Sequence, residues 1–330
     1  MYARTARIGR NMALQRMPAD RPALGLGLAA VGRPGYINLG RGADLPPYRS
    51  VGALAARTHE LLDAAYAAGV RYVDTARSYG RAEEFLATWL RERGGSDVVV
   101  GSKWGYTYTA RWRVDADVHE TKDHSLATYA RQLGETRAVL DGRLDLYQIH
   151  SMTPDSPALA DTALHRALAE LRDSGVTVGF STSGPHQAAT VDAALAVEAG
   201  GAPLFGSVQA TWNLLEPSAG PALARARDRG CRIIVKEGMA NGRLAGTAAP
   251  GPVTELAREL GTTPDAVALA AALAQPWADI VLSGAATVDQ LRSNLAAAAL
   301  PLAAAHLDSL DALAEPADAY WRHRAGLPWS

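Results

Sequence analysis

Four side chains in the first half of the sequence could together transfer a proton: Asp74, Tyr79, Lys103 and His150. A tyrosine is normally too weak an acid or base for work near neutral pH, but a nearby ammonium favours the phenolate and lowers the tyrosine pKa. A carboxylate paired with that lysine would hold the ammonium in place. A histidine could orient a carbonyl oxygen or relay the proton. The set therefore predicts acid–base chemistry, provided that the fold brings the four residues together.

Each of these residues stands at or just beyond the end of a short apolar run. Longer stretches rich in Ala, Leu and Arg, with helical spacing, separate such runs along the chain. The expected strands cover residues 23–28, 72–74, 98–101, 144–150, 176–181, 207–212, 232–236 and 279–284. Eight parallel strands with helical crossovers predict the α/β class and a (β/α)8 TIM barrel with long loops at its C-terminal face. Active sites of such barrels lie at the C-terminal ends of the strands, where the four residues fall.

The ends of the expected helices support this alternation. The helical stretch 53–68 stops before Gly69, which suits a left-handed C-terminal cap. Pro264 follows Thr263 at the start of another helix, where the missing N–H of proline costs nothing. With no linker or composition break in the chain, we expect one domain over residues 21–330, preceded by a loosely packed or disordered arm over residues 1–20.

Composition narrows the class of function. The formal net charge of -1 gives no reason to expect nucleic acid or an anionic membrane as a partner, and no apolar stretch is long and pure enough to cross a bilayer. Cys231 is the only cysteine, so we expect no disulfide, no metal site and a cytoplasmic protein. No apolar run follows the N-terminal arginines, which argues against a secretory signal. The expected partner is a small molecule.

Two segments are too long for simple connections, residues 104–123 and 315–330, and both are rich in aromatic residues. Long aromatic loops at a barrel rim often shape a substrate pocket. Trp104, Tyr106 and Trp112 are the candidates for such a pocket. The equally weighted alternative is that these segments cap the barrel or form a subunit contact.

The motifs around the four residues resemble those of the aldo-keto reductase family. They are Val-Asp-Thr-Ala-Arg-Ser-Tyr-Gly at 73–80, Gly-Ser-Lys at 101–103 and Leu-Asp-Leu-Tyr-Gln-Ile-His at 144–150. The match continues in order through 179–181, 209–214 and 284–294. The resemblance implies a barrel that binds a nicotinamide cofactor without a Rossmann domain. It also implies that Tyr79 is the general acid, that Lys103 tunes it, that Asp74 pairs with Lys103, and that His150 positions the carbonyl.

Cofactor positions follow from the same resemblance. Gln209 matches the glutamine that bonds the nicotinamide carboxamide, Ser181 lies beside it, and Trp212 matches an aromatic that stacks on nicotinamide. Thr182 stands where the family usually has asparagine, and a hydroxyl replaces only part of an amide. The motif for the adenosine end matches at Gly284, Gln290 and Asn294. Gly238, after the seventh strand, would allow close approach of the backbone to the pyrophosphate.

The family default is NADPH rather than NADH, but one position departs from it. Ala286 stands where many members carry a cation for the 2′-phosphate. Arg292, in the helix that follows, is a candidate to compensate.

The leading hypothesis is an NAD(P)H-dependent oxidoreductase that reduces an aldehyde or ketone. A non-redox enzyme on the same barrel, performing proton transfer, cyclisation or epimerisation, is the first alternative, because Thr182 and Ala286 erode the cofactor motif. The second is a cofactor-sensing binding subunit, against which the intact set of four residues argues. Taken singly, Asp74 and Lys103 could be a structural ion pair. The sequence specifies neither the substrate nor the oligomeric state.

Overall fold

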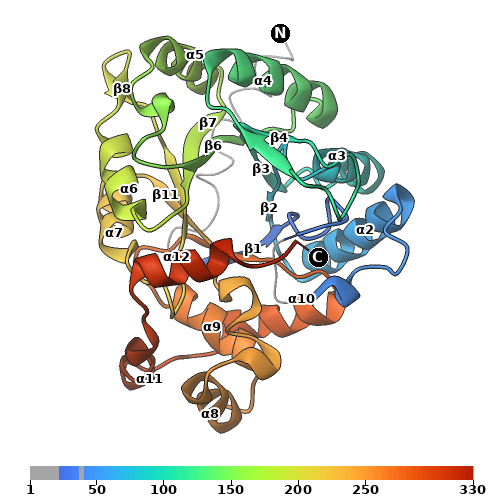
Figure 1. Ribbon diagram of the computed structural model, residues 1–330, viewed down its shortest axis with the longest axis vertical. Coiled ribbons are helices and arrows are strands. Elements are labelled where there is room, and N and C mark those ends of the chain that lie inside the picture. Colours follow the sequence, from blue (N-terminus) through green and yellow to red (C-terminus); the bar gives the residue numbers. More distant parts are fainter. Residues whose placement is uncertain (1–21, 37–40, 330) are drawn as a thin grey trace.

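Eight parallel strands close into a barrel in the computed structural model, which describes residues 22–36 and 41–329 (Figure 1). The predicted arm over residues 1–20 lies outside this part of the chain. The barrel strands are β1 (Ala23–Gly27), β2 (Tyr72–Asp74), β3 (Val99–Trp104), β6 (Leu146–Met152), β7 (Thr177–Thr182), β10 (Ser207–Thr211), β11 (Arg232–Lys236) and β12 (Ile280–Ser283). Each overlaps one predicted strand, and β1 pairs with both β12 and β2. The predicted (β/α)8 barrel is therefore confirmed.

Helices surround the barrel, and those that precede β12 lie in the connections between successive barrel strands, as Figure 1 shows. They are α2 (Val51–Ala67), α3 (Ala82–Arg93), α4 (Leu126–Leu140), α5 (Thr162–Asp173), α6 (Gln187–Leu195), α7 (Gly220–Asp228), α8 (Gly251–Glu259), α9 (Pro264–Leu273), α10 (Val288–Leu295), α11 (Ala304–Leu310) and α12 (Ala317–Ala325). The cap of α2 illustrates why they begin and end where they do. The Ser50 hydroxyl accepts the Ala53 N–H at 3.2 Å, and Gly69 has a φ of +90° just past the end of the helix. No helix in the described residues is long and apolar enough to span a membrane.

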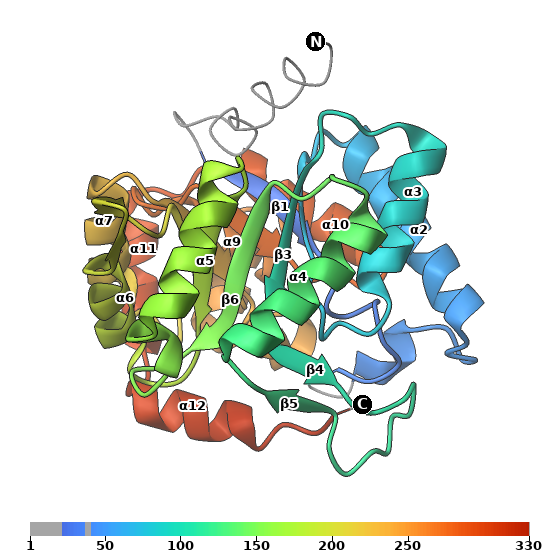
Figure 2. The same ribbon diagram turned by 90° about the horizontal axis from the view of Figure 1, so that it is seen from above.

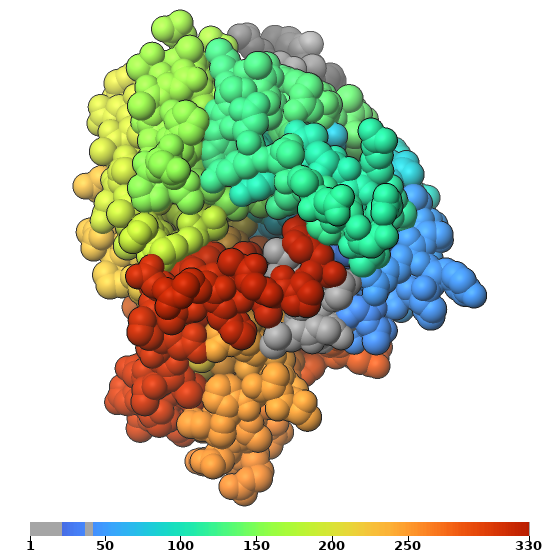
Figure 3. Space-filling view, in the orientation of Figure 1, coloured from blue at the N-terminus to red at the C-terminus, as the bar shows by residue number. Residues whose placement is uncertain are grey.

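Additional elements gather at one end of the barrel. The predicted long segment after β3 forms a hairpin of β4 (Tyr106–Tyr108) and β5 (Glu120–Lys122). Figure 2 shows this hairpin and α12 at the same end of the barrel. Because the hairpin follows β3 directly, this is the C-terminal end of the strands. Figure 3 shows the C-terminal segment, in red, lying across that face.

The interior of the barrel is filled with apolar side chains, so it is a packed core rather than a pore. The cluster inside it comprises Tyr72, Val99, Leu146, Ile234, Ile280 and Leu282. The Tyr72 ring fits because the strands on either side of β2, β1 and β3, carry glycine where the ring lies. A Cβ on Gly101 would lie 2.3 Å from Tyr72 Oη, and a Cβ on Gly25 would lie 2.9 Å from the same ring. These glycines make room for the side chains that fill the barrel interior.

We expect Gly101→Ala to lower the free energy of unfolding by about 1–3 kcal/mol, because the added methyl overpacks the barrel interior. Gly52→Ala is the matched control. Gly52 lies in α2, and a Cβ added to it would meet no atom within 4 Å, so alanine there should leave stability unchanged or raise it by up to about 1 kcal/mol. Urea unfolding followed by circular dichroism measures both. Equal stabilities for the two variants would contradict this account of the interior.

Candidate active site

The side chain of Lys103 is fully buried and has three acceptors around its ammonium. It pairs with the Asp74 carboxylate and donates to Thr75 O at 3.1 Å and to Tyr79 Oη at 3.3 Å. An ammonium has three N–H donors and no acceptor. All three N–H donors are therefore in use, and the phenol oxygen of Tyr79 accepts one of these hydrogen bonds. The hydrogen of that phenol is consequently directed away from Lys103.

Asp74 is fixed by its second oxygen as well. Its Oδ1 accepts from Gln209 Nε2 at 2.8 Å and from Tyr72 Oη at 3.3 Å. Gln209, predicted to bind the nicotinamide carboxamide, therefore also holds the carboxylate that neutralises Lys103. The buried pair is satisfied on both sides, as a buried charge pair must be if it is not to destabilise the fold.

The turn that carries Tyr79 packs against the loop after β1. A Cβ on Gly32 would lie 2.3 Å from Tyr79 O, and a Cβ on Gly80, whose φ is +61°, would lie 2.5 Å from Gly32 O. Only glycine allows both approaches and the left-handed backbone at Gly80. Behind the turn, Arg77 forms an ion pair with the buried Glu83. The phenol is thus positioned by close backbone contact rather than by a flexible loop.

His150 lies next to Tyr79, two residues before the end of β6. The two rings meet edge to face, with centroids 5.6 Å apart. The following residue, Ser151, has a φ of +56° at an irregularity in the pairing of β6 with β7, and its N–H donates to Ser181 Oγ at 2.8 Å. Ser181, predicted to contact cofactor, therefore supports the backbone turn that presents the imidazole.

Burial lowers the pKa of His150 well below its ordinary value, and the positive charges of Lys103, Lys236 and Arg33 lower it further. The imidazole is therefore uncharged at neutral pH. A neutral imidazole has one N–H donor and one acceptor nitrogen, which suits hydrogen bonding to a carbonyl oxygen.

The pKa of Tyr79 changes in the direction opposite to the one expected from the sequence. Burial raises this pKa well above 10, the nearby Asp74 carboxylate raises it further, and Arg33 opposes them. Lys103 does not produce the expected lowering of this pKa, because its ammonium is paired with the Asp74 carboxylate, whose negative charge acts in the opposite direction. Tyr79 is therefore a protonated phenol at neutral pH, which is the form that a proton donor needs.

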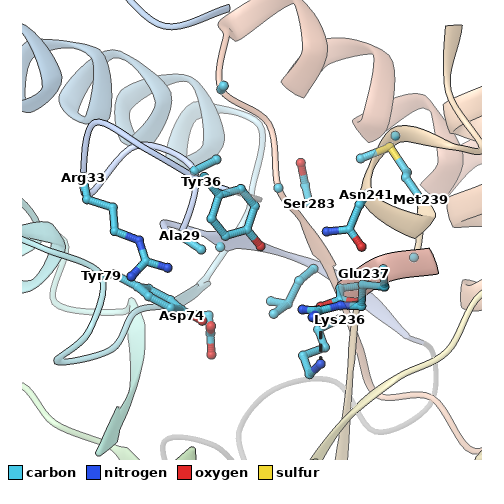
Figure 4. Close-up of a pocket in the computed structure, with 18 of the residues that line it drawn as sticks. Ala29, Arg33, Tyr36, Asp74, Tyr79, Lys236, Glu237, Met239, Asn241 and Ser283 are labelled. Carbon is cyan, nitrogen blue, oxygen red and sulfur yellow. Dashed lines mark hydrogen bonds and ion pairs between the residues drawn. The ribbon is translucent and has the colours of Figure 1, made fainter. Parts of the chain in front are cut away.

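A single cavity runs along the C-terminal face and reaches these residues. Asp74, Tyr79 and His150 line it, and Lys103 lies behind them. Figure 4 shows Tyr79, Arg33 and Tyr36 on one side of the cavity, facing Lys236, Glu237, Asn241 and Ser283 on the other. The structure thus brings the four predicted acid–base residues together, three of them at the cavity surface and Lys103 directly beneath them.

The predicted cofactor residues divide into two groups. Gln209, Gly238, Gly284 and Gln290 line the cavity; Ser181, Thr182, Trp212 and Asn294 are not among its lining residues. Thr182 donates to Gln187 Oε1 at 3.0 Å, and the Trp212 ring packs edge-on against Trp277. The Asn294 amide lies 2.8 Å from Ser283 Oγ, so Asn294 supports a residue that does line the cavity.

Only one of the three aromatic candidates for the substrate pocket lies in the cavity. Tyr106 lines it, whereas Trp104 is fully buried with its ring 5.1 Å from that of Tyr129. Trp112 packs against neighbouring side chains and donates its indole N–H to Arg49 O at 2.8 Å. Trp104 ends a strand whose residues are buried on both faces. An aromatic side chain at such a position can belong to the core or to a pocket, so residue type alone did not predict where Trp104 lies.

The C-terminal segment contributes cavity residues that the sequence did not identify individually. Arg324 on α12 forms a salt bridge with Glu237, and its Nε lies 2.8 Å from that carboxylate. Trp329 also lines the cavity, stacked on His119 with ring centroids 4.1 Å apart and with the Arg33 guanidinium 4.6 Å above it. Residues 315–329 therefore both cap the barrel and shape the cavity. The sequence analysis had treated these two roles as alternatives.

Comparisons with known proteins agree with this architecture. The family model described as the aldo/keto reductase family matches residues 53–315. The chain belongs to this family. A curated relative, aldo-keto reductase str7 from Strobilurus tenacellus, is 32% identical over 99 residues; the match covers 30% of this chain and spans 26% of the length of that relative.

Solved structures of aldo-keto reductases share the barrel. The holo form of one from Bacillus halodurans is 22% identical, with a TM-score of 0.65 over 89% of this chain and 92% of that one. A Pseudomonas aeruginosa protein given the same family assignment is 22% identical, with a TM-score of 0.61 over 84% of this chain and 88% of that one. Aldo-keto reductases are oxidoreductases that use a nicotinamide cofactor. Within residues 22–36 and 41–329, no group of three His, Cys, Asp or Glu side chains could hold a metal ion.

The salt bridge between Arg324 and Glu237 should make stability depend on pH. Burial alone would raise the pKa of Glu237, but Arg324 and Lys236 outweigh burial and lower it from 4.5 to about 2. A lowered folded-state pKa stabilises the protein above the unfolded value and loses that contribution as the pH falls through the folded one. The gap in unfolding free energy between wild type and Glu237→Gln should therefore be largest above about pH 5 and shrink toward pH 2.

The control for this measurement is Glu84→Gln, which removes an exposed ion pair with Arg81. Its gap should stay below about 1 kcal/mol at every pH, because exposed pairs contribute little. A Glu237→Gln gap that is constant down to pH 2 would contradict the proposed pairing.

Proposed function

We propose that this enzyme reduces an aldehyde or ketone with a nicotinamide cofactor, with Tyr79 as the proton donor. The observation that supports this most strongly is the arrangement around Lys103. Its three N–H donors are taken by Asp74, Thr75 O and Tyr79 Oη. The phenol oxygen therefore accepts a hydrogen bond from Lys103, and its own hydrogen is available for donation to a group in the cavity.

The cavity suits an elongated, polar cofactor. It continues from Tyr79 past Gln209 to the loop after β12, where Gly284 and Gln290 line it. A Cβ on Gly284 would meet no atom of the protein within 4 Å, so the missing side chain leaves space that belongs to the cavity. The Gln209 amide and the backbone at Gly238 would hold the nicotinamide and pyrophosphate portions. When bound, the reduced nicotinamide supplies a hydride to the carbonyl carbon.

The residues of the chain supply the remaining chemistry. The uncharged His150 donates a hydrogen bond to the carbonyl oxygen and orients it. As negative charge develops on that oxygen, Tyr79 transfers its proton to it. The phenolate left behind lies 3.3 Å from the Lys103 ammonium, which stabilises a charge that the buried site would otherwise disfavour. Asp74 holds Lys103 in place throughout.

Replacement of the donor gives a direct test. Tyr79→Phe should lower the turnover of a reactive aldehyde by about 10²–10⁴-fold, the contribution of a positioned general acid, with little effect on cofactor affinity. Oxidation of the reduced nicotinamide, followed by its absorbance, measures turnover, and quenching of tryptophan fluorescence measures binding. Tyr48→Phe is the control, since Tyr48 is 87% exposed and should leave both quantities unchanged.

Full turnover by Tyr79→Phe would contradict the proposed mechanism. Failure of the wild-type protein to bind any nicotinamide cofactor would instead favour the non-redox alternative. Tight binding without oxidation across a broad set of carbonyl compounds would favour a cofactor-sensing subunit.

A further inference from the structure

A second lysine lines the cavity, and the proposed reduction gives it no task. Lys236 is the last residue of β11, and its side chain is 16% exposed. Figure 4 shows it across the cavity from Tyr79 and Arg33. In barrels of this kind the reacting groups stand at the C-terminal ends of the strands. The amine of Lys236 therefore lies at the face where a bound carbonyl compound would react.

The nitrogen of Lys236 has fewer partners than that of Lys103. Its Nζ donates to Thr211 Oγ1 at 2.7 Å, and Thr211 is its neighbour across the pairing of β10 with β11. Glu237 Oε1 lies 3.6 Å away, which is longer than a hydrogen bond. Lys103, by contrast, donates to three acceptors. Two hydrogens of a Lys236 ammonium thus have no acceptor within hydrogen-bond distance among the described residues.

The carboxylate next to Lys236 is already held by another cation. Arg324 donates through Nε to Glu237 Oε2 at 2.8 Å and through Nη2 to Oε1 at 2.5 Å, so both oxygens are engaged. These three side chains carry two positive charges and one negative charge. The indole ring of Trp321 lies 5.8 Å from the Lys236 nitrogen. A second cation and an aromatic ring around a mostly buried ammonium favour its neutral form.

The pKa of Lys236 agrees with these contacts. Burial lowers it, Glu237 raises it, and Arg324 and Lys103 lower it, which leaves it at about 8. Roughly a tenth of the molecules therefore hold the free amine at pH 7, against fewer than about one in a thousand for a lysine of ordinary pKa. The free amine is the nucleophilic form, and desolvation beside another cation is a known way to activate it toward carbonyl compounds.

We propose that Lys236 forms a reversible imine with an aldehyde bound in the cavity. The lone pair of Nζ attacks the carbonyl carbon and forms the C–N bond. Both hydrogens of the amine then leave with the carbonyl oxygen as water, so the step consumes no oxidant and no reductant. The hydrogen bond to Thr211 Oγ1 holds the nitrogen at the cavity surface. This reaction goes beyond the proposed reduction and needs no cofactor.

Reductive trapping of the full-length protein, without nicotinamide, tests the inference. The chain has only three lysines, Lys103, Lys122 and Lys236, so each can be followed separately. Sodium cyanoborohydride converts an imine of acetaldehyde to a stable N-ethyl amine, which peptide mapping by mass spectrometry assigns to one residue. Mapping also separates the N-terminal amine, whose ordinary pKa is near 8.

At pH 7, Lys236 should be labelled at least about tenfold faster than the exposed Lys122, because a larger fraction of it is free amine. Lys103 should stay unlabelled, since it is buried and its three N–H donors are in use. Lys236→Arg keeps a cation at this position and should lose the fast label. Lys122→Arg is the matched control and should leave the labelling of Lys236 unchanged.

Labelling of Lys236 no faster than that of Lys122 in the wild type would overturn the inference, and this comparison requires no variant to fold. Retention of the fast label in Lys236→Arg would overturn it as well. Because the assay contains no cofactor, either result leaves the proposed reduction intact. Full turnover by Tyr79→Phe would in turn leave the imine intact, so the two failures are distinguishable.

Discussion

The site depends on holding one ammonium charge inside the barrel. The Lys103 side chain has no contact with solvent, and a buried charge without partners would cost several kcal/mol. Asp74, Thr75 O and Tyr79 Oη meet all three of its donors, and Gln209 in turn fixes Asp74. This requirement explains why β2, β3 and β10 must each carry a particular polar residue at the same level of the barrel. It also sets the orientation of the phenol.

The residues around the Lys103–Asp74 pair shift the pKa values of Tyr79 and His150 and add no further reacting groups to the proposed reduction. Burial and the field of Asp74 keep Tyr79 protonated, and burial together with nearby cations keeps His150 uncharged. The C-terminal segment encloses the same cavity with the salt bridge between Arg324 and Glu237 and with the Trp329 ring. One barrel face thus combines a neutral proton-donating centre with a cavity that the C-terminal segment helps to enclose.

The sequence predicted those features of the fold that depend on patterns of neighbouring residues. Apolar runs and glycine or proline at helix ends located all eight barrel strands, and the position of Lys103 at a strand end correctly implied its meeting with Asp74. The combined effect of burial and several charges on one pKa could not be predicted from the sequence. The predicted lowering of the Tyr79 pKa was therefore wrong, since this pKa is raised. Contacts between distant segments were also inaccessible, as with Arg324 on Glu237. Trp104 shows a third limit, because an aromatic at a strand end suits the core as well as a pocket.

The protonation state of Tyr79 is the central claim, and an ultraviolet difference titration of wild type against Tyr79→Phe tests it most directly. Tyrosinate absorbs at longer wavelength than tyrosine, so the difference between the two proteins reports the ionisation of this residue. We predict no tyrosinate from Tyr79 up to its ordinary pKa of 10. One equivalent of tyrosinate in the wild type at neutral pH, absent from the variant, would contradict the account.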